Sequence, residues 1–457
     1  MDYLVDTIAA ISTPYGIGGL GVIRVSGPEA LEIVDRVFFA YNRQSLVTEP
    51  GYTMRLGTVI IDEKKIDEVI VLVFKEPRSY TGEDVVEIQC HGGPVVLDTI
   101  LRSLVDNGAR IAFPGEFTRR AVVNGRISLS EAEGIGEVIS AVSKQGEQAA
   151  FALSKGSLFR EIKRMKGEIL TLQSSITAFI DFPEEDVEEI NEEEMMVSLS
   201  NLKQSLKALL DSYETGLVIL NGIPTVIAGS PNVGKSTIMN LLSGYEKAIV
   251  TPIAGTTRDI LEHRITVDGI PLILSDTAGI HLTDNIVEKI GVSKAYDTIE
   301  SSSLILAIFD NSRELSEDDY TLLDLLKGRK VLAIVNKIDL ERKLKIKEIE
   351  NNFSNVIYIS ANDESSLKIL TEEIKRVVGL DSFSSDMAIL VNERQRSAAV
   401  GAYEAVSGAL NALIDGFTVD VIYVSLDNAL SSLLELSGEN VSEAVLDEVF
   451  SNFCVGK

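Results

Sequence analysis

The fold of the middle of the chain is decided by the sequence Gly229-Ser-Pro-Asn-Val-Gly-Lys-Ser236. It matches the pattern G-x-x-x-x-G-K-[ST], and it stands between an apolar run, Thr225–Ala228, and a helical pattern, Thr237–Leu242. Glycines in such a loop let backbone N–H groups close around phosphates, and the helix that follows adds partial positive charge at its N-terminus. The sequence therefore predicts a phosphate-binding loop between a strand and a helix.

Short apolar runs separated by helical lengths of chain surround this loop. They are Thr225–Ala228, Leu272–Leu274, Leu304–Phe309, Val331–Val335 and Val356–Ile359. Strands that alternate with helices pair in parallel, because each crossover returns the chain to the same edge of the sheet. Residues 216–380 are therefore predicted to form an α/β module, a parallel sheet with helices on both faces.

The loop residues have distinct roles in the predicted site. Lys235 reaches the β and γ phosphates, and the Ser236 hydroxyl is a ligand for Mg²⁺. The nucleotide contacts predicted in this segment are Asn232, Val233, Gly234, Lys235, Ser236 and Thr237.

Three further segments determine which nucleotide the module binds. Asp276-Thr-Ala-Gly279 follows a strand, so its Asp can hold Mg²⁺ through water and its Gly N–H can sense the γ phosphate. Asn336-Lys-Ile-Asp339 follows another strand, and a carboxylate there accepts hydrogen bonds from guanine N1 and the exocyclic amine, a donor pair that adenine lacks. Ser360-Ala361 can cover the base with a backbone N–H. GTP is the predicted ligand, with contacts from Asp276, Gly279, Asn336, Lys337, Asp339, Ser360 and Ala361.

A polar segment, Gly255-Thr-Thr-Arg-Asp259, lies between the phosphate loop and Asp276. We predict a switch here, in which the Thr257 hydroxyl joins the Mg²⁺ shell only when the γ phosphate is present. Many GTPases orient the attacking water with a Gln directly after the Asp-x-x-Gly motif, but this chain has Ile280 there, which cannot do so. A group from the polar stretch Thr283–Glu288, or from a partner, must position the water.

The chain before the module mixes strands and helices. Short apolar strands, among them Gly21–Val25 and Val69–Phe74, alternate with Gly and Pro turns, and Val95–Val105 has a helical pattern. This combination predicts an N-terminal α+β domain.

Long helices are predicted from about residue 119 onward. One apolar seam steps by four and three residues through Leu158, Ile162, Met165, Ile169, Leu172, Ile176 and Phe179. The acidic run from Glu184 to Glu194 predicts a solvated helix start or loop. After about residue 385 the chain is helical again, with amphipathic patterns at Ala399–Ile414 and Val441–Phe453.

These patterns predict four segments: an N-terminal α+β domain (1–118), a first helical segment (119–215), the α/β module (216–380) and a second helical segment (381–457). The simplest account is that the module is inserted into one helical domain built from both flanks. Four separate domains in series are the alternative.

The composition excludes several classes of protein. The 457 residues carry 42 Lys plus Arg and 69 Asp plus Glu, and this net charge of −27 argues against nonspecific nucleic-acid binding but leaves a local basic patch open. Two cysteines exclude a disulfide framework and indicate a reducing compartment, and with three His they are too few for a convincing zinc site. No apolar stretch approaches the ~20 residues that span a bilayer, and the N-terminus lacks a targeting pattern, so we expect a cytoplasmic protein without membrane contact.

Motifs along nearly the whole chain resemble one family. They are Asp6-Thr-Ile-Ala-Ala10, Gly18-Gly-Leu-Gly-Val-Ile-Arg24, Tyr80-Thr-Gly-Glu-Asp84, His91-Gly-Gly93, Pro114-Gly-Glu-Phe-Thr-Arg119 and Phe453-Cys-Val-Gly-Lys457. Together with the Asn in the phosphate loop, they resemble the MnmE (TrmE) family, the GTPases of tRNA uridine 5-carboxymethylaminomethyl modification. The C-terminal Cys-x-Gly-Lys is the most specific of these motifs, because many families share the GTPase motifs.

The resemblance implies a Ras-like P-loop GTPase domain inserted into a discontinuous helical domain. It also implies an N-terminal domain that dimerises and binds 5-formyltetrahydrofolate or a related one-carbon folate. Members act as homodimers with MnmG, an FAD protein, in a heterotetramer that adds an aminomethyl-type group at C5 of the wobble uridine of certain tRNAs. Their GTPase domains dimerise across K⁺, which takes the place of an arginine finger and stimulates hydrolysis.

The roles of particular residues are also implications of the resemblance. The K⁺ ligands would be Asn232, Thr251, Ile253 and Thr256, and the nucleotide contacts then include Thr251, Thr256 and Thr257. The folate contacts would be Arg24, Glu87, Arg126 and Lys457. Glu288 would orient the attacking water, and Cys454 is a candidate catalytic thiol near the folate, whereas Cys90 is expected to be a packing residue.

A GTP-dependent switch in ribosome assembly is the rival hypothesis. Such proteins share the four GTPase motifs, but they usually carry an RNA-binding module or a second GTPase domain, and this sequence shows neither. A membrane-remodelling GTPase would need an apolar or basic amphipathic membrane segment, and the long seam helix is too evenly charged for that.

Overall fold

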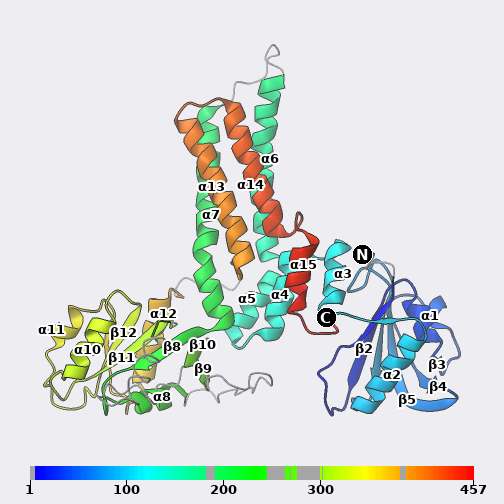
Figure 1. Ribbon diagram of the computed structural model, residues 1–457, viewed down its shortest axis with the longest axis horizontal. Helices are drawn as coiled ribbons and strands as arrows, with labels where there is room; N and C mark the ends of the chain where they lie inside the picture. The colour runs from blue at the N-terminus through cyan, green and yellow to red at the C-terminus, as the bar shows by residue number, and fades with distance from the viewer. Residues whose placement is uncertain are drawn as a thin grey trace. The chain divides into compact units, whose positions relative to one another are not determined.

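The computed structural model describes residues 6–181, 191–243, 263–267, 269–274, 299–300, 302–380 and 387–457 (Figure 1). The chain divides into two units. The first comprises Met1–Gly136 with Leu430–Lys457, and the second comprises Glu137–Ala429.

The first unit contains a seven-stranded sheet with the order β3-β4-β5-β6-β2-β1-β7. Its strands are β1 (Ile8–Ile11), β2 (Gly21–Ser26), β3 (Phe38–Ala40), β4 (Thr53–Ile61), β5 (Lys64–Phe74), β6 (Val85–Cys90) and β7 (Arg110–Ile111). Neighbouring strands are antiparallel except β1 and β7, which are parallel. The predicted strands Gly21–Val25 and Val69–Phe74 lie within β2 and β5, so both predictions are confirmed.

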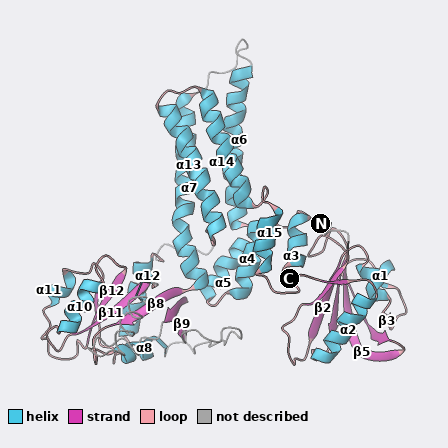
Figure 2. Ribbon diagram, in the orientation of Figure 1, coloured by secondary structure: helices cyan, strands magenta, loops and turns pink. Residues whose placement is uncertain are grey.

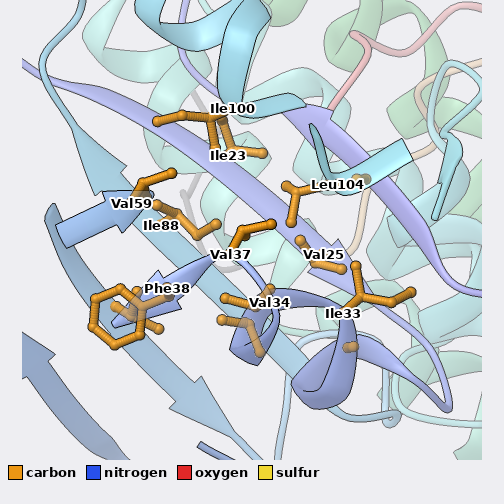
Figure 3. Close-up of a cluster of buried hydrophobic side chains, with 14 of the residues drawn as sticks. Ile23, Val25, Ile33, Val34, Val37, Phe38, Val59, Ile88, Ile100 and Leu104 are labelled. Carbon is orange, nitrogen blue, oxygen red and sulfur yellow. The ribbon is translucent and has the colours of Figure 1, made fainter. Parts of the chain in front are cut away.

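Helices cover this sheet, and the core lies between their apolar side chains and those of the strands. The helices are α1 (Ala30–Asp35), the 3₁₀ turn η1 (Leu46–Thr48) and α2 (Pro94–Asp106), which confirms the helix predicted at Val95–Val105. Figure 3 shows Ile33 and Val34 of α1 and Ile100 of α2 in one cluster with the strand residues Ile23 and Ile88, and all five side chains are fully buried. Burial of such aliphatic side chains is the main favourable term in folding.

Cys90 lies at the end of β6 in the same core and is buried. Burial, together with the nearby carboxylate of Asp67, raises the pKa of this thiol to about 11. The thiol is therefore protonated at neutral pH, and the packing role predicted for Cys90 is confirmed.

The remaining helices of the first unit are α3 (Glu116–Val123) and α15 (Glu443–Ser451), and α4 (Leu129–Ser140) begins in it. Leu129 and Ala132 of α4 pack with Phe450 of α15 in a separate buried cluster. The predicted amphipathic helix at Val441–Phe453 is therefore confirmed as α15, although it is shorter than predicted at both ends.

The second unit contains the long helices. They are α5 (Lys144–Ser154), α6 (Ser157–Asp181), α7 (Glu192–Asn221), α13 (Glu393–Ile414) and the larger part of α14 (Val419–Ser437), whose residues from Leu430 onward belong to the first unit. Figure 2 shows α6, α7 and α13 lying lengthwise beside one another, and both α6 and α13 contact α7. Asn191 caps α7 by accepting hydrogen bonds from the backbone N–H groups of Glu193 and Glu194, so the predicted acidic helix start is confirmed for these residues. The rest of the acidic run, 182–190, lies outside the described residues.

The predicted seam of α6 is correct over most of its length but wrong at its end. Leu158, Ile162, Met165, Ile169 and Ile176 are fully buried, whereas Phe179 is 41% exposed. Leu172, also predicted in the seam, is only half-buried, and its neighbour Gln173 is buried. A seam that repeats every seven residues drifts by about 20° per heptad around a straight α-helix, so after three heptads Phe179 has turned away from the buried face.

The α/β module is inserted between α7 and α13, as predicted. Leu390, just before α13, donates its N–H to the Ser212 hydroxyl of α7 at 3.2 Å. Gly216, one turn further along α7, allows a still closer approach, because a Cβ there would lie 2.3 Å from the Leu390 carbonyl oxygen. The parts of the two helical segments that flank the module thus pack against each other, and the chain leaves and re-enters them on either side of the module. The boundaries at 118, 215 and 380 stay predictions.

The module contains a six-stranded sheet with the order β13-β12-β11-β8-β10-β9. Its strands are β8 (Ile223–Ala228), β9 (His263–Val267), β10 (Ile270–Leu274), β11 (Leu304–Asp310), β12 (Val331–Asn336) and β13 (Val356–Tyr358), and its helices are α8 (Lys235–Ser243), α10 (Glu317–Leu325), α11 (Ile346–Glu350) and α12 (Ser366–Val378). The five strands from β13 to β10 are parallel, and all five were predicted.

The predicted parallel sheet is extended by one further edge strand, β9, which runs antiparallel to β10 and makes the sheet mixed. Only two residues separate Val267 from Ile270, and a connection of that length allows a hairpin but no crossover. β9 is not recognisable as a strand from the sequence, because His263-Arg-Ile-Thr-Val267 places only Ile265 and Val267 among polar residues and has no continuous apolar run.

Within the described ranges, none of the helices combines the length and the apolar content that a bilayer crossing requires.

The Gly216 contact predicts a destabilising substitution. Gly216→Ala should lower the free energy of unfolding by about 2 kcal/mol, because the new methyl group must displace the backbone at Leu390. Gly167→Ala in α6 is the matched control, since a Cβ there meets nothing within 4 Å. It should raise stability by about 0.5–1 kcal/mol through the better helix propensity of Ala. Urea unfolding of the full chain measures both, and equal effects of the two substitutions would contradict the role given to Gly216.

Candidate functional site

The phosphate loop runs from the end of β8 to the start of α8 and has a shape that few residues permit. Gly234 has a φ of +107°, and a Cβ there would lie 2.3 Å from Nδ2 of Asn336. Asn232 has a φ of +66°, a left-handed conformation that Asn tolerates better than most residues. The local backbone therefore requires glycine at position 234 and favours asparagine at position 232.

The ammonium group of Lys235 lies over the loop. Its Nζ donates to the carbonyl oxygens of Gly229 at 2.6 Å and Ser230 at 3.2 Å. Burial lowers the pKa of Lys235. Ser236, in the first turn of α8, is exposed, so its hydroxyl is accessible. A cation and an accessible hydroxyl thus stand at a helix N-terminus, the arrangement that binds phosphate.

Asn336, at the end of β12, connects the phosphate loop to the predicted base-binding loops. Its Nδ2 donates to the Val233 carbonyl oxygen at 2.8 Å, and its Oδ1 accepts from the Ala361 N–H at 2.9 Å. Asn336 and Ser360 are buried. The phosphate loop and the Ser360-Ala361 loop are therefore held at the same edge of the sheet by one amide.

Lys337 forms a second connection to the phosphate loop. Its Nζ donates to the Asn232 carbonyl oxygen at 2.7 Å and pairs with the Asp310 carboxylate at 2.6 Å. Burial alone would raise the pKa of Asp310, but hydrogen bonds from Lys337 and Ser312 outweigh it and lower the pKa. The carboxylate is thus ionised at neutral pH and holds Lys337 against the loop.

Asp339 follows in the same loop and is exposed. Its position is set by one backbone hydrogen bond from each neighbouring residue. Ile338 donates its N–H to the Ile359 carbonyl oxygen, and Leu340 donates its N–H to the Lys337 carbonyl oxygen. The structure thus gathers the predicted nucleotide residues of β8, β12 and β13 at the carboxyl ends of parallel strands, where such folds bind ligands.

Seven predicted residues lie outside the described residues. They are Thr251, Ile253, Thr256, Thr257, Asp276, Gly279 and Glu288. Their roles stay predictions.

A second group of predicted residues meets on the sheet of the first unit. Arg24 of β2 and Glu87 of β6 are directly paired in the strand register, and Nε and Nη2 of Arg24 donate to Oε1 of Glu87 at 2.9 and 2.8 Å. The guanidinium also stacks on two rings, 4.9 Å from the centroid of Tyr80 and 5.6 Å from that of Phe117. Arg24 is therefore fixed from several sides, with cation–π contacts adding to the ion pair.

The C-terminal residues dock beside Arg24. The Gly456 carbonyl oxygen accepts from Nη1 of Arg24 at 3.3 Å and from the Ser12 hydroxyl at 3.1 Å. Gly456 has a φ of +91°, and a Cβ there would lie 2.5 Å from the Ile11 carbonyl oxygen, so only glycine fits. Phe117 donates its N–H to the backbone oxygen of Lys457 at 3.2 Å.

The side chains of the C-terminal motif have different surroundings. Burial, and then the nearby charge of Arg24, lower the pKa of Lys457. Cys454 is exposed, and its carbonyl oxygen accepts from the Gly115 N–H at 3.4 Å. The Cys454 thiol and the Lys457 amine therefore belong to the C-terminal segment that docks beside the Arg24–Glu87 pair.

Arg126 is exposed and is tied to the same region through the backbone. Its Nε donates to the Ser79 carbonyl oxygen at 3.2 Å, next to the Tyr80 ring that stacks on Arg24. The sequence analysis did not single out Tyr80 and Phe117 individually. Both residues lie inside motifs that carry the family resemblance, and those motifs are the sequence feature that could have pointed to them.

Comparisons with known proteins agree with this architecture. Residues 129–454 match the family described as MnmE helical domain, and residues 7–126 match the family described as GTP-binding protein TrmE N-terminus. The chain belongs to the MnmE family. It is 40% identical over 459 residues to the tRNA modification GTPase MnmE of Thermoanaerobacter pseudethanolicus (strain ATCC 33223 / 39E), covering 99% of each chain. It is 39% identical over 460 residues to the protein of the same name from Clostridioides difficile (strain 630), covering 100% of each chain.

Solved GTPase structures resemble parts of this MnmE-family chain. A variant of Era from Aquifex aeolicus, bound to GDP and AlF4⁻, is 26% identical with a TM-score of 0.26, over 40% of this chain and 65% of that chain. The GTPase domain of the T. maritima FeoB iron transporter is 27% identical with a TM-score of 0.26, over 34% of this chain and 96% of that chain.

The exposed carboxylate of Asp339 predicts a change of base specificity. Asp339→Asn replaces an acceptor pair by one acceptor and one donor, so the affinity for GTP should fall by about 100-fold while that for XTP, which has a carbonyl in place of the amine, should rise. Competition against a fluorescent guanine nucleotide measures both. Asp324→Asn is the control, because this exposed carboxylate of α10 pairs with Lys327, a neighbour on the surface outside the predicted nucleotide residues. Unchanged GTP affinity in Asp339→Asn would contradict the assignment.

Proposed function

We propose that this chain is a GTP-hydrolysing enzyme of tRNA modification, acting on the wobble uridine of certain tRNAs. The observation that carries the proposal is the meeting of the phosphate loop, Asn336 and Asp339 at one sheet edge. It occurs in a chain that relatives named tRNA modification GTPase MnmE match from end to end. The proposed compartment is the cytoplasm.

In the proposed hydrolysis, the chain's own residues bind the nucleotide and place the attacking water. Lys235 contacts the β and γ phosphates, and Asp339 accepts from the guanine edge. Glu288 orients the water, because Ile280 stands where many GTPases have the water-orienting Gln and cannot take that role. The proposed roles of Lys235 and Asp339 are supported by the loop geometry, and that of Glu288 by the family resemblance alone.

Two ions belong to the proposal. Mg²⁺ prefers oxygen ligands, and the accessible hydroxyl of Ser236 fits it, with Thr257 as the second proposed ligand. The exposed amide of Asn232 offers an oxygen suited to K⁺, with Thr251, Ile253 and Thr256 as further proposed ligands. When bound, these ions neutralise charge that develops on the phosphates.

The second proposed ligand is 5-formyltetrahydrofolate or a related one-carbon folate, held by Arg24, Glu87, Arg126 and Lys457. The chemistry of the donors supports this, because a folate combines a hydrogen-bonding ring with carboxylates, and the site combines an acid with three basic residues. Cys454 is the proposed thiol beside it. The proposed partners are a second copy of the chain, MnmG in a heterotetramer, and tRNA.

The direct test is mass spectrometry of wobble-uridine nucleosides in tRNA from cells that lack this chain. We expect loss of the 5-aminomethyl-type side chain, and its return when the intact gene is supplied. A gene that lacks Cys454–Lys457 should fail to restore it, whereas Asp324→Asn, which changes an exposed carboxylate of α10 that has no proposed role, should restore it. An unchanged nucleoside profile would contradict the proposal and favour the ribosome-assembly hypothesis.

The proposed cation site predicts a dependence on the monovalent ion. GTP hydrolysis should be at least about tenfold faster in K⁺ than in Na⁺ at equal ionic strength. Glu288→Ala should reduce turnover by about 100-fold or more while fluorescent GDP still binds. Equal rates in both ions would contradict the role of Asn232, and loss of GDP binding in Glu288→Ala would make Glu288 a structural residue.

A further inference from the structure

The phosphate loop has a third attachment, which lies outside the sequence motif. The hydroxyl of Ser230, the second residue of the loop, donates a hydrogen bond to Oδ1 of Asp319 in α10. Ser230 is 7% exposed and Asp319 is 1% exposed, so water does not compete freely for this bond. The pattern G-x-x-x-x-G-K leaves position 230 open, and therefore the motif contains no sign of this contact.

The other oxygen of Asp319 is also fully engaged. Oδ2 accepts from Nη1 of Arg313 at 2.7 Å, from the Ser316 N–H at 2.9 Å and from the Ser316 hydroxyl at 2.8 Å. Burial alone would raise the pKa of Asp319, but the hydrogen bonds from Ser230 and the loop before α10 lower it. Asp319 is thus an ionised, buried carboxylate with fixed partners on both sides.

Ser230 transmits this rigidity to the phosphate-binding lysine. Its side chain is held by Asp319, and its carbonyl oxygen accepts from Nζ of Lys235 at 3.2 Å. The far end of the loop is held separately, by Asn336 on the Val233 carbonyl oxygen at 2.8 Å. The loop is therefore fixed at both ends. Asp319 holds the end at Ser230, where backbone carbonyl oxygens accept from Lys235.

We propose that Asp319 is a positioning residue of the nucleotide site, which acts on the phosphate loop through the Ser230 hydroxyl. This inference rests on the proposed binding of guanine nucleotides by the loop. A loop that is already in shape loses little conformational freedom when phosphate binds, so its N–H groups and Lys235 bind more tightly than those of a loose loop. Without the Ser230 bond, the loop relaxes and one oxygen of a buried carboxylate loses its donor.

A purely structural role for Asp319 makes a different prediction. Asp319 is also the third residue of α10, in a capping box with Ser316, so its loss destabilises that helix. Ser230 lies in the phosphate loop and takes no part in the cap. A substitution at Ser230 therefore separates positioning of the loop from capping of the helix.

The experiment measures the affinity of the full-length chain for GDP that carries a fluorescent N-methylanthraniloyl group, together with kcat and KM for GTP. In Ser230→Ala the dissociation constant should rise by about 10-fold, because the loosened loop must be ordered when phosphate binds. The melting temperature should fall by a few degrees for the lost bond, and the chain should stay folded at the assay temperature. Ser230→Thr keeps the hydroxyl and should restore the affinity to within about twofold. Thr321→Ala is the matched control, because this exposed hydroxyl of α10 donates only to Glu317 of its own helix.

A double-mutant cycle completes the test. Ser230→Ala should add less than about a twofold loss of affinity in a chain that already carries Asp319→Ala, which leaves no acceptor for the Ser230 hydroxyl, because the two residues act through one bond. Unaltered affinity in Ser230→Ala would overturn the inference, as would fully additive losses in the cycle. If the unaltered chain itself failed to bind the nucleotide, the proposed function would fail first, a result that differs from both of these.

Discussion

The close approach of α7 to the segment before α13 determines how the second unit is built. Gly216 leaves room for the backbone at Leu390, and Ser212 accepts the Leu390 N–H. Because these residues stand on either side of the inserted module in the sequence, their contact brings the two ends of the module together. The module can then complete its own sheet and core while the helical domain forms from two distant pieces of chain.

Both candidate sites are also held together by contacts between segments that lie far apart in the sequence. Asn336 joins the phosphate loop to the loop after β13, and Gly456 joins the last residues of the chain to Arg24 of β2. In each case a buried amide or carbonyl group finds its partner in a segment far away in the sequence. Since an unpaired buried polar group is costly, these bonds hold the functional loops in one arrangement. The two sites are therefore parts of the folding architecture as well as places for ligands.

Strands, helices and loops could be predicted from the sequence more accurately than the contacts between them. The five parallel strands and the phosphate loop were predictable, because apolar runs and a glycine pattern are local signals. The edge strand β9 was missed, since its alternating pattern is weak in a sequence dominated by buried strands. Phe179 was assigned to a buried seam that the helix geometry rotates away from its partners. Tyr80 and Asp319 could not be chosen on sequence alone, because their contacts with Arg24 and Ser230 join residues far apart in the chain.

The classes of domain and the family could be recognised from the sequence alone, and residues for a nucleotide and a folate could be predicted from it, because motifs and hydrophobic periodicity are local properties of the chain. Which of these residues touch, and what holds them, follows from the tertiary structure. It placed Lys337 between Asn232 and Asp310, set Gly456 against Arg24, and connected Ser230 to a carboxylate 89 residues away. Those contacts depend on which strands lie side by side and which buried groups need partners, and both are settled only when the whole chain packs.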